Sequence, residues 1–175
     1  YADLIDDWDK ATTFSLPLRE KLNLECPLQI KEEILQSQDK NSLKSLINLA
    51  DGLKIETVLL RHADGRDTVC VSSQVGCALG CQFCATGQQG FKRNLTTGEI
   101  LEQVLFFARL LKKTNEKVTG VVFMGMGEPA HNLDNVLEAI TLLGTQGNIG
   151  HKNLVLSTVG DERVFARLAQ HLVKP

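Results

Sequence analysis

Residues 67–87 read DTVCVSSQVGCALGCQFCATG, and this stretch decides most of what the chain can fold into. It opens with a run of β-forming residues, Thr68–Ser72, that predicts a strand. The run leads within a few residues to three cysteines spaced C-x3-C-x2-C, which are Cys77, Cys81 and Cys84. A strand that delivers three thiols into one loop predicts a metal site beside the end of a sheet.

Downstream of this stretch, helix and strand patterns alternate. Thr96 followed by Glu99 is a capping box that predicts the start of a helix. Three successive β–α units favour parallel strands joined by helical crossovers. The predicted class is α/β, either a small open sheet or the first half of a larger (β/α) barrel. Apolar periodicity predicts helices over residues 100–111, 133–144 and 164–172. Between them, it predicts strands over residues 118–124 and 154–158.

Upstream of residue 67 the patterns differ. Residues 1–36 predict helices, with a break at Pro27 and a second short helix through Ile30, Ile34 and Leu35. Residues 46–73 predict a small antiparallel hairpin that turns at Asp64-Gly65. The predicted organisation is a helical accessory region over residues 1–45, a small β segment over residues 46–66 and an α/β domain over residues 67–175.

Composition narrows the function classes. An apolar fraction of 43% and a charged fraction of 23% are typical of a soluble globular protein, and no apolar run approaches the roughly 18 residues of a membrane span. The five cysteines, four of them within residues 70–84, do not form the pattern of a secreted disulfide framework. We therefore expect a cytoplasmic protein without membrane association.

The cysteine spacing favours an iron–sulfur cluster. A [4Fe–4S] cubane normally takes four thiolates, so three local cysteines leave one iron open for a substrate. A zinc site completed by His62 or another residue is an alternative, although no second Cys-x2-Cys pair is present. Three buried, inert thiols are a further alternative.

The run from Cys70 to Leu95 resembles the radical S-adenosylmethionine (SAM) enzymes. Within them it resembles the adenine-C2 methyltransferases that modify 23S rRNA and tRNA. Three shorter segments carry the same resemblance, namely Ile55–Val58, Met124–Pro129 and Leu156–Gly160. The resemblance implies a partial (β/α) barrel of the radical SAM type, a [4Fe–4S] cluster on the three cysteines, and SAM as the second cofactor.

The resemblance also implies roles for single residues. Gly127 and Glu128 match the segment that meets the amino group of SAM, and Ser157 matches a further cofactor contact. Glu56 matches the proton acceptor for the C2 hydrogen of adenine. Cys70 matches a redox-active cysteine that releases the RNA product by forming a disulfide with a second, methyl-carrying cysteine.

That methyl-carrying cysteine lies far toward the C-terminus in the family, and no cysteine follows Cys84 here. We therefore expect a fragment that lacks the C-terminal half and is not competent for full turnover alone. The implied partners are 23S rRNA, tRNA and an electron donor such as flavodoxin or ferredoxin, and we expect a monomer. Lys92 and Arg93 are the expected local RNA contacts.

Two alternatives remain open from the sequence. Sister enzymes methylate C8 of the same rRNA adenine and share the cluster and both cysteines. A non-catalytic iron–sulfur electron carrier would hold the cluster but bind no SAM.

Overall fold

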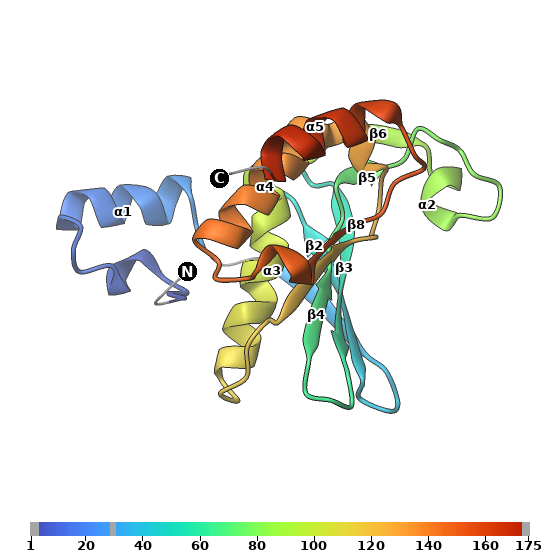
Figure 1. The fold of residues 1–175 in the computed structure, drawn as a ribbon. Helices are drawn as coiled ribbons and strands as arrows, with labels where there is room; N and C mark the ends of the chain where they lie inside the picture. Colours follow the sequence, from blue (N-terminus) through green and yellow to red (C-terminus); the bar gives the residue numbers. More distant parts are fainter. Residues whose placement is uncertain (1–3, 29–30, 173–175) are drawn as a thin grey trace.

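The structure is a computed structural model that describes residues 4–28 and 31–172. Its centre is a six-stranded sheet in the order β1-β2-β3-β4-β7-β8, and β5 and β6 form a second, two-stranded sheet (Figure 1). The strands are β1 (Lys31–Gln36), β2 (Ser42–Asn48), β3 (Lys54–Arg61), β4 (Asp67–Cys70), β5 (Gln74–Gly76), β6 (Phe91–Asn94), β7 (Gly120–Phe123) and β8 (Leu154–Leu156).

The large sheet changes character at β4. Strands β1 to β4 pair antiparallel, with the β3–β4 hairpin that the sequence predicts, whereas β4, β7 and β8 pair parallel. This confirms the α/β class and the succession of β–α units. The helices that the structure describes are α1 (Leu16–Glu25), α2 (Ala85–Gln88), α3 (Thr97–Lys112), α4 (Leu133–Thr145) and α5 (Glu162–Leu172), with short 3-10 turns at Trp8–Lys10, Pro129–Asn132 and His151–Asn153.

Helices α3 and α4 lie beside one face of the large sheet (Figure 1). Helix α3 begins with the predicted capping box, in which the Thr96 hydroxyl accepts from the Glu99 N–H and the Glu99 carboxylate accepts from the Thr96 N–H. Alternate strand residues and the apolar stripes of both helices form one core, which includes Ile55, Leu59, Val69, Val121, Phe123, Val104, Phe107, Leu111, Val136, Leu137 and Leu143.

The opposite face of the sheet is partly exposed. Strand register aligns one row of residues across this face, and directly paired residues share a face. The Val155 side chain at the β8 end of the row is 43% exposed. The row consists of Lys44, Val58, Cys70, Val122 and Val155.

The structure corrects the helix that the sequence predicts through Ile34 and Leu35. Both residues lie in β1, which pairs antiparallel with β2 from Lys31 to Gln36, and Ile30 lies outside the described residues. Three apolar residues are too few to establish a helical period, so antiparallel pairing with the next strand, β2, decides the local structure. The domain boundaries at residues 45 and 66 stay a prediction.

The N-terminal region docks through few contacts. Helix α1 has no buried residue. The Arg109 side chain on α3 donates from Nε to the carbonyl oxygen of Ile5 at 3.0 Å and from Nη1 to that of Leu28 at 3.5 Å. One arginine thus binds both ends of the region that contains α1. No helix within residues 4–28 and 31–172 has the length and apolarity needed to cross a bilayer.

Candidate functional site at the carboxyl ends of the parallel strands

The three clustered cysteines lie in the connection between β5 and β6. Cys77 follows β5 directly and is buried, whereas Cys81 and Cys84 are partly exposed. The Cys77 N–H donates to the carbonyl oxygen of Gly90 at 3.1 Å, and the Cys84 N–H donates to that of Cys81 at 3.0 Å. These bonds close a compact loop that holds all three thiols.

Gly76 allows the chain to enter this loop. Its φ is +74°, and a Cβ atom at this position would lie 1.8 Å from the carbonyl oxygen of Gly90. Any larger residue would therefore push the two ends of the loop apart. The strand pairing is also irregular here, because the register between β5 and β6 shifts at Val75 and Gly76.

The environment of the thiols differs between Cys84 and Cys70. Hydrogen bonds from the backbone N–H groups of Gly87 and Thr86 lower the pKa of the Cys84 thiol, which favours the thiolate that a metal binds. Burial raises the pKa of the Cys70 thiol, and a backbone N–H of Met124 opposes this only in part. All five cysteines are free thiols.

The chemistry of the donor set suits an iron–sulfur cluster, because thiolates are the usual ligands of such clusters. Cys77, Cys81 and Cys84 are three free thiols on one loop, and the pKa of Cys84 is lowered. Among the residues that the structure describes, no three His, Cys, Asp or Glu side chains gather closely enough to hold one metal ion.

Glu128 lies in the loop after β7, where it caps the 3-10 turn Pro129–Asn132, and is 5% exposed. Its carboxylate accepts hydrogen bonds from the Ala130 N–H at 3.0 Å, from the Thr158 hydroxyl and from the Val159 N–H at 3.2 Å. The last two donors follow β8. Glu128 therefore joins the loop after β7 to the loop after β8.

Gly127 packs against Gln74, which immediately precedes the cysteine loop. Gly127 has a φ of +96°, and a Cβ atom there would lie 2.5 Å from the Gln74 Cβ. The Gln74 side chain accepts from the Glu128 N–H at 2.9 Å, and its backbone N–H donates to the Met126 carbonyl oxygen at 3.2 Å. Strand β5, which leads into the cysteine loop, is thus held against the Gly127–Glu128 segment.

Ser157 is exposed and lies just after the end of β8. Its two successors on the chain bond to Glu128. The structure therefore brings together the segments that carry the predicted site residues. These residues are Cys77, Cys81, Cys84, Gly127, Glu128 and Ser157.

Glu56 and Cys70 lie on the partly exposed face of the sheet, on neighbouring strands. Cys70 pairs directly with Val58, two residues beyond Glu56 on β3. The Glu56 carboxylate forms an ion pair with Lys44 at 2.6 Å, and the Glu56 N–H donates to the Met126 sulfur at 3.3 Å. The ion pair with Lys44 is a feature that sequence reasoning missed.

Buried amides around the site were also missed. Gln103 on α3 is fully buried, accepts from the Ser72 N–H at 2.8 Å and donates to the Ser72 carbonyl oxygen at 3.0 Å. Asn132 donates to the carbonyl oxygens of Ser73 and Leu95 at 2.8 and 2.7 Å. A glutamine within the apolar stripe of α3 was the signal that could have revealed the first of these.

Arg93 is engaged in ion pairs within the fold. Its guanidinium donates to both Glu99 carboxylate oxygens, at 2.9 and 2.8 Å, and to Asp51 at 2.6 Å. The pairs with Glu99 and Asp51 raise the pKa of Arg93. These pairs compensate its charge, so Arg93 is a weaker candidate for an RNA contact than the exposed Lys92.

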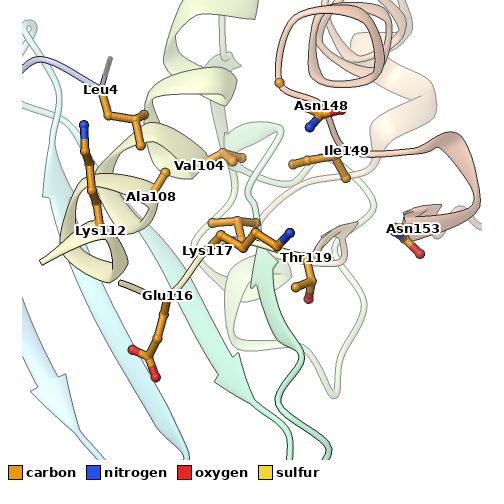
Figure 2. Close-up of a pocket in the computed structure, with 12 residues that line it drawn as sticks. Leu4, Val104, Ala108, Lys112, Glu116, Lys117, Thr119, Asn148, Ile149 and Asn153 are labelled. Atoms are coloured by element: carbon orange, nitrogen blue, oxygen red, sulfur yellow. The ribbon is translucent and has the colours of Figure 1, made fainter. Parts of the chain in front are cut away.

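A hollow of about 440 Å³ lies elsewhere, at the amino ends of β7 and β8 (Figure 2). It is lined by residues of α3, of the segment before β7 and of the segment between α4 and β8, and it contains no cysteine. The residues labelled there include Val104, Lys112, Glu116, Lys117, Thr119, Ile149 and Asn153. The cysteine loop lies at the opposite ends of the strands, so this hollow is not part of the candidate site.

Comparison with known proteins adds independent evidence. A sequence profile of the radical SAM superfamily matches residues 71–174. A probable RNA methyltransferase of Methylibium petroleiphilum is 57% identical over 165 residues, which cover 91% of this chain and 44% of that protein. Another from Bordetella avium is 62% identical over 130 residues, which cover 74% of this chain and 34% of that protein.

The fold has a counterpart among solved structures. The crystal structure of a radical SAM methyltransferase from Sphaerobacter thermophilus matches with a TM-score of 0.90 at 40% sequence identity. The match covers 97% of this chain and 51% of that chain. The present chain therefore spans about half the length of that protein and less than half the length of the two relatives above.

Proposed function

The chain belongs to the radical SAM superfamily, and from this premise we propose that it is the cluster-binding part of a SAM-dependent RNA methyltransferase. The names of the relatives support RNA as the substrate class. The observation that carries the proposal is the meeting of three loops at the carboxyl ends of β4, β7 and β8, where parallel sheets bind ligands.

Each loop contributes a part of the proposed site. Cys77, Cys81 and Cys84 would hold the [4Fe–4S] cluster. Gly127 and Glu128 would bind the amino group of SAM, and Ser157 would make a further contact to it. When bound, the cluster supplies the electron that cleaves SAM reductively.

Glu128 retains capacity for this role. A carboxylate has about four acceptor sites, and within residues 4–28 and 31–172 three donors bond Glu128. One direction is left for an ammonium-like donor, and a charge-assisted bond in a buried position is strong.

We further propose that the reaction modifies C2 of adenine in 23S rRNA and tRNA. Glu56 would accept the C2 proton, and Cys70 would release the product by a disulfide with a cysteine outside this chain. The shared sheet face of Glu56 and Cys70 supports this, because both side chains can face one substrate. The target adenine must leave its stack to reach such a site.

The remaining features of the proposal concern the cell. We propose a monomeric cytoplasmic enzyme that receives electrons from flavodoxin or ferredoxin. Lys92 would contribute to the RNA contact, together with basic surface outside this chain.

Three measurements test the proposal. Anaerobic reconstitution of this chain should give about four irons and four sulfides, and calorimetry should then detect SAM binding. Iron uptake without SAM binding would favour a simple electron carrier. For the longer protein, mass spectrometry of digested RNA should find 2-methyladenosine, and 8-methyladenosine would identify the sister activity.

The longer protein also tests Cys70. The Cys70→Ala variant should still cleave SAM but should accumulate a covalent protein–RNA species, because no thiol remains to free the product. A denaturing gel detects that species. Turnover at the wild-type rate with no adduct would show that Cys70 is only a packed strand residue.

A further inference from the structure

Three polar residues, Gln74, Glu128 and Thr158, form a chain of hydrogen bonds across the candidate site, which we call the tie. Gln74, which leads into the cysteine loop, accepts from the Glu128 N–H at 2.9 Å and donates to Asn94 at 2.7 Å. The Glu128 carboxylate in turn accepts from the Thr158 hydroxyl. The tie therefore runs from β5, which leads into the cysteine loop, through the loop after β7, to the loop after β8.

Burial makes this tie strong. Gln74 is 1% exposed and Glu128 is 5% exposed, so water competes little for their bonds. A buried carboxylate must be compensated by donors, and bonds to an ionised group are about twice as strong as bonds between neutral groups. Thr158 is the one side-chain hydroxyl that bonds this carboxylate within the described part of the chain.

The geometry gives Thr158 a separate task from Glu128. The Ala130 N–H and the Thr158 hydroxyl both bond Oε1, whereas the Val159 N–H bonds Oε2. Three donors on the two oxygens together fix the orientation of the carboxylate. Thr158, which lies thirty residues away along the chain, supplies the side-chain donor of the three, and its bond helps to set the direction of the remaining acceptor site.

We propose that Thr158 is a positioning residue for SAM, which acts by orienting the Glu128 carboxylate and by tying the loop after β8 to the cysteine loop through Gln74. The inference deepens the proposed function and rests on it. Thr158 directly follows Ser157, and its hydroxyl bonds Glu128, so it acts through Glu128.

The test replaces Thr158 by the isosteric Val, which removes the hydroxyl, and by Ser, which keeps it. Thr141→Val is the matched control, because Thr141 is also half-buried and its hydroxyl bonds only the Leu137 carbonyl oxygen within α4, at 3.0 Å. Each variant of this chain is reconstituted anaerobically, and its iron content, its SAM dissociation constant and its thermal unfolding are measured.

Thr158→Val should keep full iron content but bind SAM about tenfold more weakly, the scale of one charge-assisted bond. Thr158→Ser and Thr141→Val should bind SAM as wild type does. Without any cofactor, amide hydrogen exchange at Ala130 and Val159 should be faster in Thr158→Val than in wild type, because a carboxylate held by two donors instead of three is less firmly fixed and protects both N–H groups less.

The outcomes distinguish a failure of the proposed function from a failure of the positioning role of Thr158. If the wild-type chain takes up iron but binds no SAM, the proposed function fails. If wild type binds SAM and Thr158→Val binds it equally well, the positioning role is wrong. Equal losses in Thr158→Val and Thr141→Val, with matching drops in unfolding temperature, would reduce Thr158 to an ordinary contributor to stability.

Discussion

The two ends of the parallel strands β4, β7 and β8 are built in different ways. At the carboxyl ends, buried polar side chains such as Gln103, Glu128 and Asn132 bond to backbone and side-chain groups of neighbouring loops. At the amino ends lie hollows of about 440 and 640 Å³ lined by charged residues that include Glu116 and Lys117.

This difference shows where the fold uses its polar contacts. Loops that position a reacting group must hold it closely, and buried hydrogen bonds supply that rigidity. The amino ends need only close the sheet, so exposed ion pairs such as Arg61–Glu116 are sufficient there. Substitutions at the two ends should therefore differ in kind as well as in size.

The largest expected effect is at the cysteine loop. Changing Cys77, Cys81 or Cys84 to Ala should remove most of the iron that the reconstituted chain takes up, because the cluster loses one of three local ligands. Cys70→Ala is the matched control and should retain its iron. Colorimetric iron and sulfide assays measure both, and stoichiometric zinc without iron uptake would overturn the assignment.

A smaller effect is expected where α3 supports the same end of the sheet. Gln103→Met keeps the side-chain length but leaves the Ser72 N–H and carbonyl groups buried without partners. Each lost partner costs about 1–3 kcal/mol, so the loss of two should lower the free energy of unfolding by roughly 2–6 kcal/mol. Urea denaturation measures the change.

The exposed Gln146 at the end of α4 offers a control for this variant. Gln146→Met should change the free energy of unfolding by less than about 0.5 kcal/mol. Similar small changes in both variants would mean that Gln103 is not a structural part of the site.

Local signals in the sequence were enough for the β–α units. The capping box at Thr96 and the apolar stripe of α3 depend on residues within one or two turns, and both were predicted. The strands β1 and β2 and the pair β5–β6 were not predicted, because these strands are defined by backbone pairing with a second segment and not by a clear apolar period of their own.

The residues of the candidate site also differ in whether a local pattern in the sequence could predict them. The spacing of Cys77, Cys81 and Cys84 is local and was readable as a metal-binding pattern. The bond between Glu128 and Thr158 depends on how two loops meet, and no spacing rule gives it. Arg93 is a similar case, because its ion pairs with Asp51 and Glu99 depend on the fold and no local pattern gave them, whereas its expected contact with RNA stays a prediction.

The smallest expected effect is at the amino end of β4, where Asp67 is buried. Burial raises the pKa of this carboxyl above its ordinary value, although Arg61 nearby opposes the rise. A carboxyl whose pKa is raised on folding contributes stability that is present at low pH and lost as pH rises through the folded pKa. Asp67→Asn should therefore gain stability relative to wild type as pH rises from about 3.8 toward neutrality.

Asp64, in the adjoining turn, provides the control of opposite sign. A hydrogen bond from the Arg66 side chain lowers the pKa of the exposed Asp64 carboxyl. Its contribution is present at neutral pH and lost as pH falls through the folded pKa, so Asp64→Asn should be slightly less stable than wild type at pH 7 and equal to it in acid. Urea denaturation across this pH range measures both variants. If Asp67→Asn lost stability at neutral pH as Asp64→Asn does, the Arg61 charge would outweigh burial, and the amino end of β4 would rely on paired charges after all.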